Sequence, residues 1–82
     1  MKFTVYSKSG CPYCDKVKTV LNALKESKGI DLVTYELGRD FNREEFYAEF
    51  GVGSTFPQVV YENNHLGGCR ETIQYLQESN II

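Results

Sequence analysis

Residues 2–24 read KFTVYSKSGCPYCDKVKTVLNAL, and this stretch predicts a strand, a turn and a helix in succession. Over Lys2–Ser7 the residues alternate in polarity, with Phe3 and Val5 on the same side. A period of two residues is typical of a strand that buries one face. The chain is therefore expected to open with a strand packed against a core.

The second part of this stretch predicts a helix that begins at Pro12. Proline suits the first helical position because its missing N–H costs nothing there, and this makes Cys11 the N-cap. The buried stripe expected from helical spacing is Val17, Val20, Leu21 and Leu24. Gly29 is a natural stop for this helix.

The middle of the chain predicts a second strand and a short helix. Over Leu32–Leu37 the apolar residues Val33, Tyr35 and Leu37 alternate with Thr34 and Glu36, which predicts a strand. The helix before it is long enough to be the crossover between two parallel strands. Asn42 and Glu45 form a capping box, which starts a helix that runs to Phe50 and is closed by Gly51. We also expect Phe41 to pack on Phe46 as a hydrophobic staple.

The last third predicts a hairpin and a final helix. Gln58–Tyr61 and His65-Leu66 are the expected strands, with Asn63-Asn64 as the turn. A helix over 69–79 follows, with Ile73 and Leu76 on its inner face. The alternation of strands and helices predicts an α/β fold, with one domain spanning residues 1–82.

Composition excludes several classes of function. The chain has 82 residues, nine basic and eleven acidic, and no block of like charges, so nucleic acid is not an expected partner. No apolar run approaches the ~20 residues of a membrane span. The first residues lack the apolar core of a signal peptide, so we expect a cytoplasmic protein. Three cysteines cannot all pair and indicate chemistry rather than disulfide stapling.

The motif Cys11-Pro12-Tyr13-Cys14 is the main candidate for that chemistry. At a helix start, unpaired N–H groups and the helix dipole favour an anion such as a thiolate. Such positions lower a cysteine pKa from ~8.5 to roughly 3.5–7.5, and Lys8 adds a nearby cation. Cys11 is therefore the expected nucleophile, and Cys14 is the expected resolving thiol.

A zinc site is the alternative for this pair. His65 and Cys69 would complete a set of three cysteines and one histidine with Cys11 and Cys14. That set requires a hairpin far along the chain to converge on the helix start. Pro12 at the helix start favours the redox interpretation.

Three motifs in this order resemble the glutaredoxin family over nearly the whole chain. They are Lys8-x-x-Cys11-Pro12-Tyr13-Cys14, then Thr55-Phe56-Pro57, then Gly67-Gly68-Cys69. The resemblance is to the dithiol type, and the short chain would suit a small bacterial or viral member. It implies a thioredoxin-like fold, a four-stranded mixed sheet with three flanking helices.

The resemblance also implies a glutathione-dependent thiol–disulfide oxidoreductase that takes part in electron transport. Cys11 would attack a disulfide, and Cys14 or glutathione would resolve the product. Glutathione is then a co-substrate, with no tightly bound cofactor and no metal. The expected partners are glutathione and disulfide-containing or glutathionylated proteins, with ribonucleotide reductase among the candidates. A monomer is expected.

The site residues that the resemblance implies form a groove for glutathione. Pro57 would be cis, with the Phe56 backbone facing the cysteinyl part. The N–H groups of Cys69 and Arg70 would bind the γ-glutamyl carboxylate, and Glu71 its amine. The expected glutathione-binding residues are Lys8, Tyr13, Thr55, Phe56, Pro57, Gly68, Cys69, Arg70 and Glu71. Arg39 could join Lys8 at the glycyl carboxylate or be a solvated surface charge.

Several points remain open in the sequence. Phe56, Ser54 and Arg70 depart from common family residues, which leaves substrate preference undecided. Cys69 is expected to be structural, although its helix start could make it reactive. His65 is expected to be a solvated turn residue. The aromatic residues expected only to pack are Phe41, Phe46, Tyr47 and Phe50.

Two other functions compete with the glutathione-dependent enzyme. One is a thioredoxin-like reductant that is recycled by a flavoprotein rather than by glutathione. Gly67-Gly68 and Glu71 favour glutathione over this alternative. The other is metal binding through Cys11, as zinc or as an iron–sulfur cluster. Pro12 argues against the cluster.

Overall fold

The computed structural model describes residues 1–82 and contains four strands and three helices in the predicted order. The elements are β1 (Lys2–Ser7), α1 (Pro12–Lys28), β2 (Asp31–Glu36), α2 (Arg43–Phe50), β3 (Gln58–Tyr61), β4 (Asn64–Gly67) and α3 (Cys69–Glu78).

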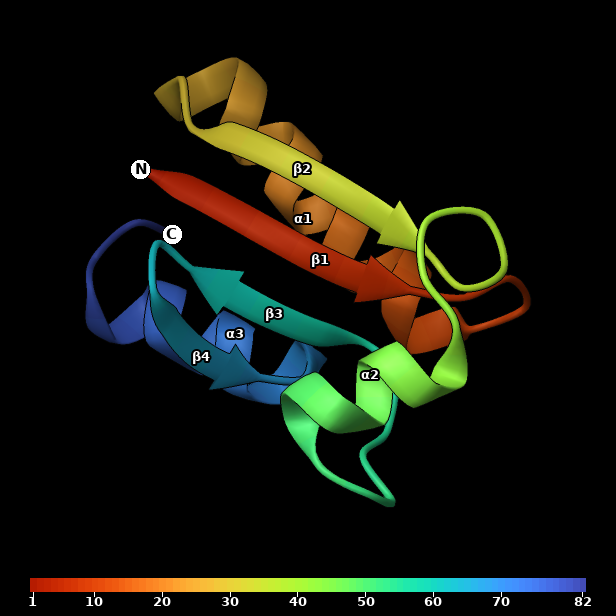
Figure 1. Ribbon diagram of the computed structural model, residues 1–82. Helices are drawn as coiled ribbons and strands as arrows, with labels where there is room; N and C mark the ends of the chain where they lie inside the picture. Colours follow the sequence, from red (N-terminus) through yellow and green to blue (C-terminus); the bar gives the residue numbers. More distant parts are fainter.

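The four strands form one mixed sheet in the order β2-β1-β3-β4 (Figure 1). β1 is parallel to β2 and antiparallel to β3, and β3 and β4 form an antiparallel hairpin. The parallel pair is the one joined by α1, as expected from the need for a crossover connection. The predicted mixed sheet with three helices is confirmed.

The core lies between the sheet and the two helices α1 and α3, which are behind the sheet in Figure 1. Phe3, Val5 and Val59 of the sheet are fully buried there. Val17 and Leu21 of the predicted stripe are also fully buried, whereas Val20 is only partly buried against the cluster. Burial of this apolar surface is the main force that holds α1 and α3 to the sheet.

α2 packs on the opposite face of the sheet through aromatic rings. Tyr6 of β1 lies 5.4 Å from Phe41 and 4.9 Å from Phe50, between ring centroids. The predicted capping box of Asn42 is present, and the predicted contact of Phe41 with Phe46 is made at 5.8 Å. α2 is thus attached to the sheet by side chains.

The second strand differs from the prediction in its bounds, and the apolar side expected from its alternation is not the side that meets the core. It begins at Asp31, and Leu37 lies beyond its end in an isolated bridge with Phe41. Leu32 lies opposite Phe3 and packs on the core, whereas Tyr35 lies opposite Tyr6 on the α2 face. Because β2 is an edge strand with apolar residues on both faces, polarity alone does not reveal which face is buried.

The hairpin turn also differs from the prediction. Asn64 pairs with Tyr61 and is therefore the first residue of β4, so the two turn residues are Glu62 and Asn63. Glu62 takes the left-handed backbone conformation at φ 53°. The last helix ends at Glu78, and Ser79 is its C-cap.

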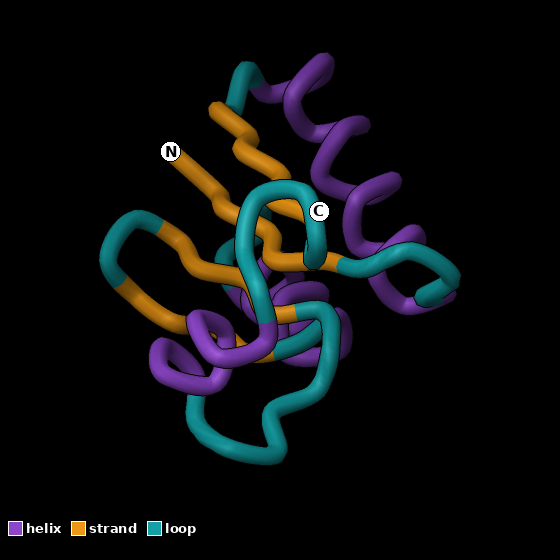
Figure 2. The backbone as a smooth tube through the Cα atoms, turned by 45° about the vertical axis from the view of Figure 1, so that its right-hand side comes forward, coloured by secondary structure: helices purple, strands orange, loops and turns teal.

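The loops that follow β1 and β2 meet at one end of the sheet. Figure 2 turns this end forward: the loop after β2 crosses in front of the strands, and the loop after β1 extends to the right toward α1. The loop after β1 leads into the Cys11 motif, so the motif lies at the carboxyl end of the parallel strand pair. None of the helices has the length and apolarity that crossing a membrane requires.

Candidate active site

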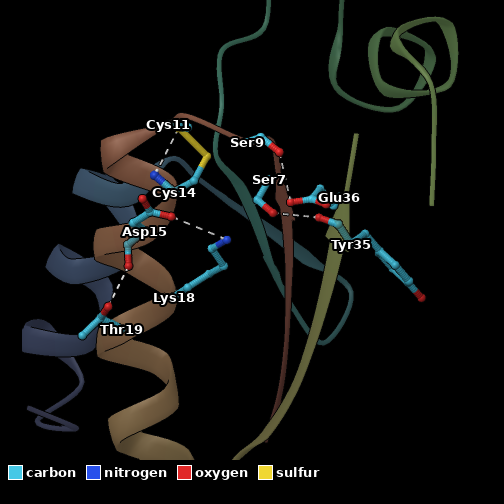
Figure 3. A network of polar contacts seen from close by, with 9 residues as sticks. All are labelled: Ser7, Ser9, Cys11, Cys14, Asp15, Lys18, Thr19, Tyr35 and Glu36. Atoms are coloured by element: carbon cyan, nitrogen blue, oxygen red, sulfur yellow. Dashed lines mark hydrogen bonds and ion pairs between the residues drawn. A yellow bond between two sulfur atoms is a disulfide. The ribbon is translucent and has the colours of Figure 1, made fainter. Parts of the chain in front are cut away.

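Cys11 is the N-cap of α1, as predicted. Its side chain accepts a hydrogen bond from the Cys14 N–H, with 3.2 Å between nitrogen and sulfur, and Pro12 is the first helical residue. Cys11 and Cys14 form a disulfide in this structure, with their Cα atoms 5.2 Å apart (Figure 3). The structure therefore represents the oxidised form of a dithiol pair.

The two cysteines differ in access to solvent. Cys14 is fully buried, and Cys11 is 6% exposed. Polar contacts hold the surrounding backbone. The Asp15 N–H donates to the Cys11 carbonyl, and the buried Ser7 hydroxyl donates to the Tyr35 carbonyl, the latter drawn in Figure 3. Cys11 is thus the more accessible residue of the pair.

A groove of about 880 Å³ opens beside the motif. Its lining comes from the first turns of α1, from the loop before β3 and from α3. The lining residues are Tyr13, Lys16, Thr55, Phe56, Pro57, Gly68, Cys69, Arg70, Glu71, Ile73, Gln74 and Gln77. All the expected glutathione-binding residues except Lys8 are among them.

The loop before β3 is held in a defined shape by Gln58. The Phe56–Pro57 peptide bond is cis, as predicted. The buried Gln58 amide donates to the Thr55 carbonyl at 2.8 Å, and its oxygen lies 2.6 Å from Nε2 of His65. His65 is exposed, as expected, but the prediction that it is a turn residue is wrong, because it belongs to β4 and lies beside Gln58.

The Phe56 side chain contacts both the groove and α2. It lines the groove, and its ring stacks on Phe46 of α2 with centroids 4.1 Å apart. Lys8 does not line the groove; its ammonium lies 5.4 Å from the centre of the Phe56 ring. Ser54 also lies outside the groove, and its hydroxyl donates to the Phe50 carbonyl at the end of α2.

Arg39 lies outside the groove and forms an ion pair with Asp40 at 2.8 Å. Its guanidinium lowers the pKa of the Asp40 carboxyl through a side-chain hydrogen bond, and the same bond raises the pKa of Arg39. Both residues are exposed. This placement agrees with a surface charge.

The start of α3 approaches the loop before β3 closely at Gly68. A Cβ on Gly68 would lie 3.2 Å from a Glu71 carboxylate oxygen and 3.4 Å from the Pro57 carbonyl oxygen. The Gly68 N–H donates to the same Glu71 oxygen at 2.8 Å. One oxygen of Glu71 is therefore engaged, which leaves the other for a ligand.

Cys69 follows directly as the first residue of α3. It is a free thiol, and its side chain is part of the buried core cluster. Burial raises the pKa of the Cys69 thiol, Glu71 raises it further and Lys16 acts in the opposite direction. A thiol that is disfavoured as an anion fits the structural role expected for it.

The alternative zinc set is not gathered in this structure. His65 lies on the α2 face, with its ring 4.9 Å from that of Phe50. No group of three or more His, Cys, Asp or Glu side chains is placed to hold one metal ion.

Four groove residues were missed in the sequence. They are Lys16, Ile73, Gln74 and Gln77. The last three share the three- and four-residue spacing of one helix face with Arg70, a signal that could have identified them. Lys16 could be found only once α1 and α3 were known to pack side by side.

Comparisons with known proteins give one consistent family. The family model described as Glutaredoxin matches residues 3–66. A glutaredoxin from Vernicia fordii is 38% identical over 79 residues, covering 95% of this chain and 74% of the relative.

Solved structures agree with this match. Reduced Escherichia coli glutaredoxin aligns over all of both chains with a TM-score of 0.82 and 21% identity, which bears on the fold alone. A buckwheat glutaredoxin–glutathione complex aligns with a TM-score of 0.69 and 27% identity, over 94% of this chain and 69% of that one.

The family match runs from β1 to β4 and includes the motif at the start of α1. The oxidised Cys11–Cys14 pair supplies the chemistry of disulfide exchange. The chain therefore belongs to the glutaredoxin family of thiol–disulfide oxidoreductases.

Proposed function

We propose that this protein is a glutathione-dependent oxidoreductase that reduces protein disulfides and glutathione mixed disulfides. The observation that carries the proposal is the groove beside Tyr13, which the loop of Pro57 and the start of α3 complete. The buckwheat relative solved as a glutathione complex supports it.

Cys11 is the nucleophile in this proposal. In the reduced protein, the Cys14 N–H that now donates to the Cys11 sulfur would stabilise a thiolate at the same atom. The helix dipole acts in the same direction. Cys14 is fully buried and therefore acts second, as the resolving thiol.

Two routes then complete the reaction. With a glutathione mixed disulfide, the Cys11 thiolate attacks the glutathione sulfur and releases the substrate thiolate, and a second glutathione thiolate frees Cys11 as glutathione disulfide forms. With a protein disulfide, Cys14 attacks the mixed disulfide on Cys11, releases the reduced substrate and leaves the intramolecular disulfide. Two glutathione molecules then reduce that disulfide.

Glutathione would bind along the groove mainly through backbone groups. The Phe56 backbone would pair with the cysteinyl part as an added strand does. The N–H groups of Cys69 and Arg70 at the start of α3 would bind the γ-glutamyl carboxylate. The second oxygen of Glu71 is free for the amine, because only the first is engaged by Gly68.

The proposal includes the wider setting. Glutathione is a co-substrate rather than a tightly bound cofactor, and disulfide-containing or glutathionylated proteins are the macromolecular partners. The chain acts as a monomer and one domain in the cytoplasm, as part of thiol electron transport.

The test is glutathione-coupled reduction of a small mixed disulfide by the wild type, Cys11→Ser and Cys14→Ser. We expect Cys11→Ser to lose activity by at least about a hundredfold, because an alcohol does not replace the thiolate. Cys14→Ser should retain it and lose reduction of a protein disulfide.

A parallel assay coupled to a flavoprotein reductase is the control. Wild-type activity there, with none in the glutathione-coupled assay, would contradict the proposal in favour of a thioredoxin-like reductant. Equal activity of Cys11→Ser and wild type would contradict the assigned nucleophile.

A further inference from the structure

A second cavity, of about 330 Å³, lies on the sheet face that α2 covers. Its walls include the rings of Tyr6, Tyr35, Phe41 and Phe46. Tyr6 lies 5.4 Å from both Tyr35 and Phe41, between ring centroids. The Tyr35 ring points away from α1 in Figure 3, so the cavity and the main core occupy opposite faces of the sheet.

The remaining lining residues are acidic: Asp40, Glu45 and Glu49. Asp40 is neutralised by its ion pair with Arg39. Glu45 uses one oxygen to accept from the Asn42 N–H, and neither Glu45 nor Glu49 forms an ion pair. Glu45 and Glu49 are both exposed, so two uncompensated carboxylates, which repel each other at this four-residue spacing, lie at the rim of an aromatic cavity.

The Tyr6 hydroxyl reports the same negative environment. Burial raises the pKa of Tyr6, and the charge of Glu49 raises it further. A raised pKa keeps the phenol neutral, so Tyr6 adds no negative charge of its own to the cavity.

The chemistry of the walls selects the charge of the occupant. Aromatic faces carry negative quadrupole density and attract ammonium and guanidinium groups, most strongly when water is excluded. Unpaired carboxylates at the rim add to this attraction and repel anions. A cationic side chain satisfies both features.

One ring connects this cavity with the groove. The Phe56 ring stacks on Phe46 at 4.1 Å and lies 6.2 Å from Phe41, and these two rings line the cavity. Phe56 itself lines the groove. The groove and the cavity are therefore linked through the stacked Phe56 and Phe46 rings, and a protein substrate that extends from the groove past Phe56 would meet the cavity.

We propose that the cavity walled by Tyr6, Tyr35, Phe41 and Phe46 binds an arginine or lysine side chain of the protein substrate. This inference rests on the proposed function and adds a specificity determinant to it. It predicts a preference for protein disulfides that have a basic residue nearby.

The first experiment measures cation binding directly. Nitrogen-15-labelled protein is titrated with N-acetyl-arginine amide and, as the neutral counterpart of the same shape, N-acetyl-citrulline amide. We expect chemical-shift changes at Tyr6, Tyr35 and Glu49 with the arginine compound only. They should disappear in the double variant Glu45→Gln/Glu49→Gln, in which the amide oxygen introduced at position 45 can still accept the capping hydrogen bond.

The second experiment measures turnover of glutathionylated decapeptides that differ only in where one arginine stands relative to the cysteine. Each is compared with its citrulline version. At the spacing that reaches the cavity, we expect kcat/KM to be about threefold to tenfold higher for arginine, the effect of one cation–π contact and one exposed ion pair. The double variant should lose this preference.

Glu44→Gln is the matched control, because Glu44 is an exposed residue of α2 that does not line the cavity. It should keep the preference. The inference is overturned if no spacing distinguishes arginine from citrulline, or if Glu44→Gln loses the preference equally. Turnover of the small mixed disulfide, which has no peptide, tests the proposed function separately.

Discussion

Cys11 and Cys69 lie at the N-termini of two different helices, and each is 6% exposed. Their positions relative to the start of their own helices differ by one residue. Cys11 is the N-cap of α1, and its sulfur accepts the Cys14 N–H. Cys69 comes one position later in α3, where Gly68 is the N-cap, and its sulfur enters the core cluster.

This difference separates two effects that are often attributed together to a helix start. The dipole is available to both cysteines, but only the N-cap side chain turns back toward the unpaired N–H groups. At Cys69 burial dominates and raises the pKa of the thiol. A helix N-terminus therefore activates a thiol only where the sulfur reaches its donors.

The largest expected contrast is in alkylation of the reduced protein. At pH 6.5 we expect iodoacetamide to modify Cys11 at least about tenfold faster than Cys69, because only Cys11 would be substantially thiolate. Peptide mapping by mass spectrometry gives the two rates. Oxidised protein is the control, in which the Cys11–Cys14 disulfide protects both of those sulfurs. Equal alkylation rates at Cys11 and Cys69 would contradict the inference that only the N-cap cysteine is activated.

A smaller effect is expected from filling the space at the start of α3. In Gly68→Ala the new Cβ would press on Glu71 and on the Pro57 carbonyl. We expect KM for glutathione to rise about fivefold, equivalent to weakening one hydrogen bond, with less change in kcat. Gly29→Ala is a control for lost stability, because Gly29 has a left-handed backbone with φ 69°, where alanine is strained, and lies outside the groove; its KM should be unchanged. An unchanged KM in Gly68→Ala would contradict the assignment of the start of α3 to the glutathione-binding site.

The smallest effect concerns pH and stability. Because the pKa of Cys69 is raised on folding, the folded protein keeps this proton where the unfolded chain has lost it. The contribution to stability is complete below the ordinary cysteine pKa of about 8.5 and is lost as pH rises through the folded value. Between pH 8 and 10, oxidised wild type should therefore lose more of its urea midpoint than oxidised Cys69→Ala. If the urea midpoints of both proteins fell equally, the loss would come from groups that the two proteins share. The argument that burial of Cys69 contributes to stability would then be wrong.

The features predicted correctly from the sequence are those encoded locally. Pro12 after Cys11 fixes the start of α1, and Asn42 with Glu45 fixes the start of α2, because each depends on neighbours within one helical turn. The buried stripe of α1 follows from helical spacing alone.

The wrong predictions concern pairing between distant segments. Leu32 faces the core because β2 aligns Leu32 with Phe3, a register that the strand's own polarity does not encode. Likewise, Asn64 joins β4 through its pairing with Tyr61, which moves the turn to Glu62 although Asn is the better turn residue.

The candidate site also contains residues that were predictable from their neighbours and residues whose roles depend on contacts between distant segments. The motif residues could be identified from their order, whereas Gln58 and Lys16 acquire roles only after folding. Gln58 supports the loop before β3 through the Thr55 carbonyl, and Lys16 reaches the groove because α1 packs beside α3. Two of the aromatic residues expected only to pack, Phe41 and Phe46, also line the second cavity.

The donor that contacts the Cys11 sulfur is a main-chain N–H, which every residue except proline provides at position 14. Side chains at positions 12 and 13 are not part of that hydrogen bond. Substitutions there can accumulate and reshape the groove wall, where Tyr13 is 65% exposed, without removing the bond. The fold thereby leaves room for the interior of the motif to diverge, so that relatives can acquire new substrates while retaining the same reactive sulfur.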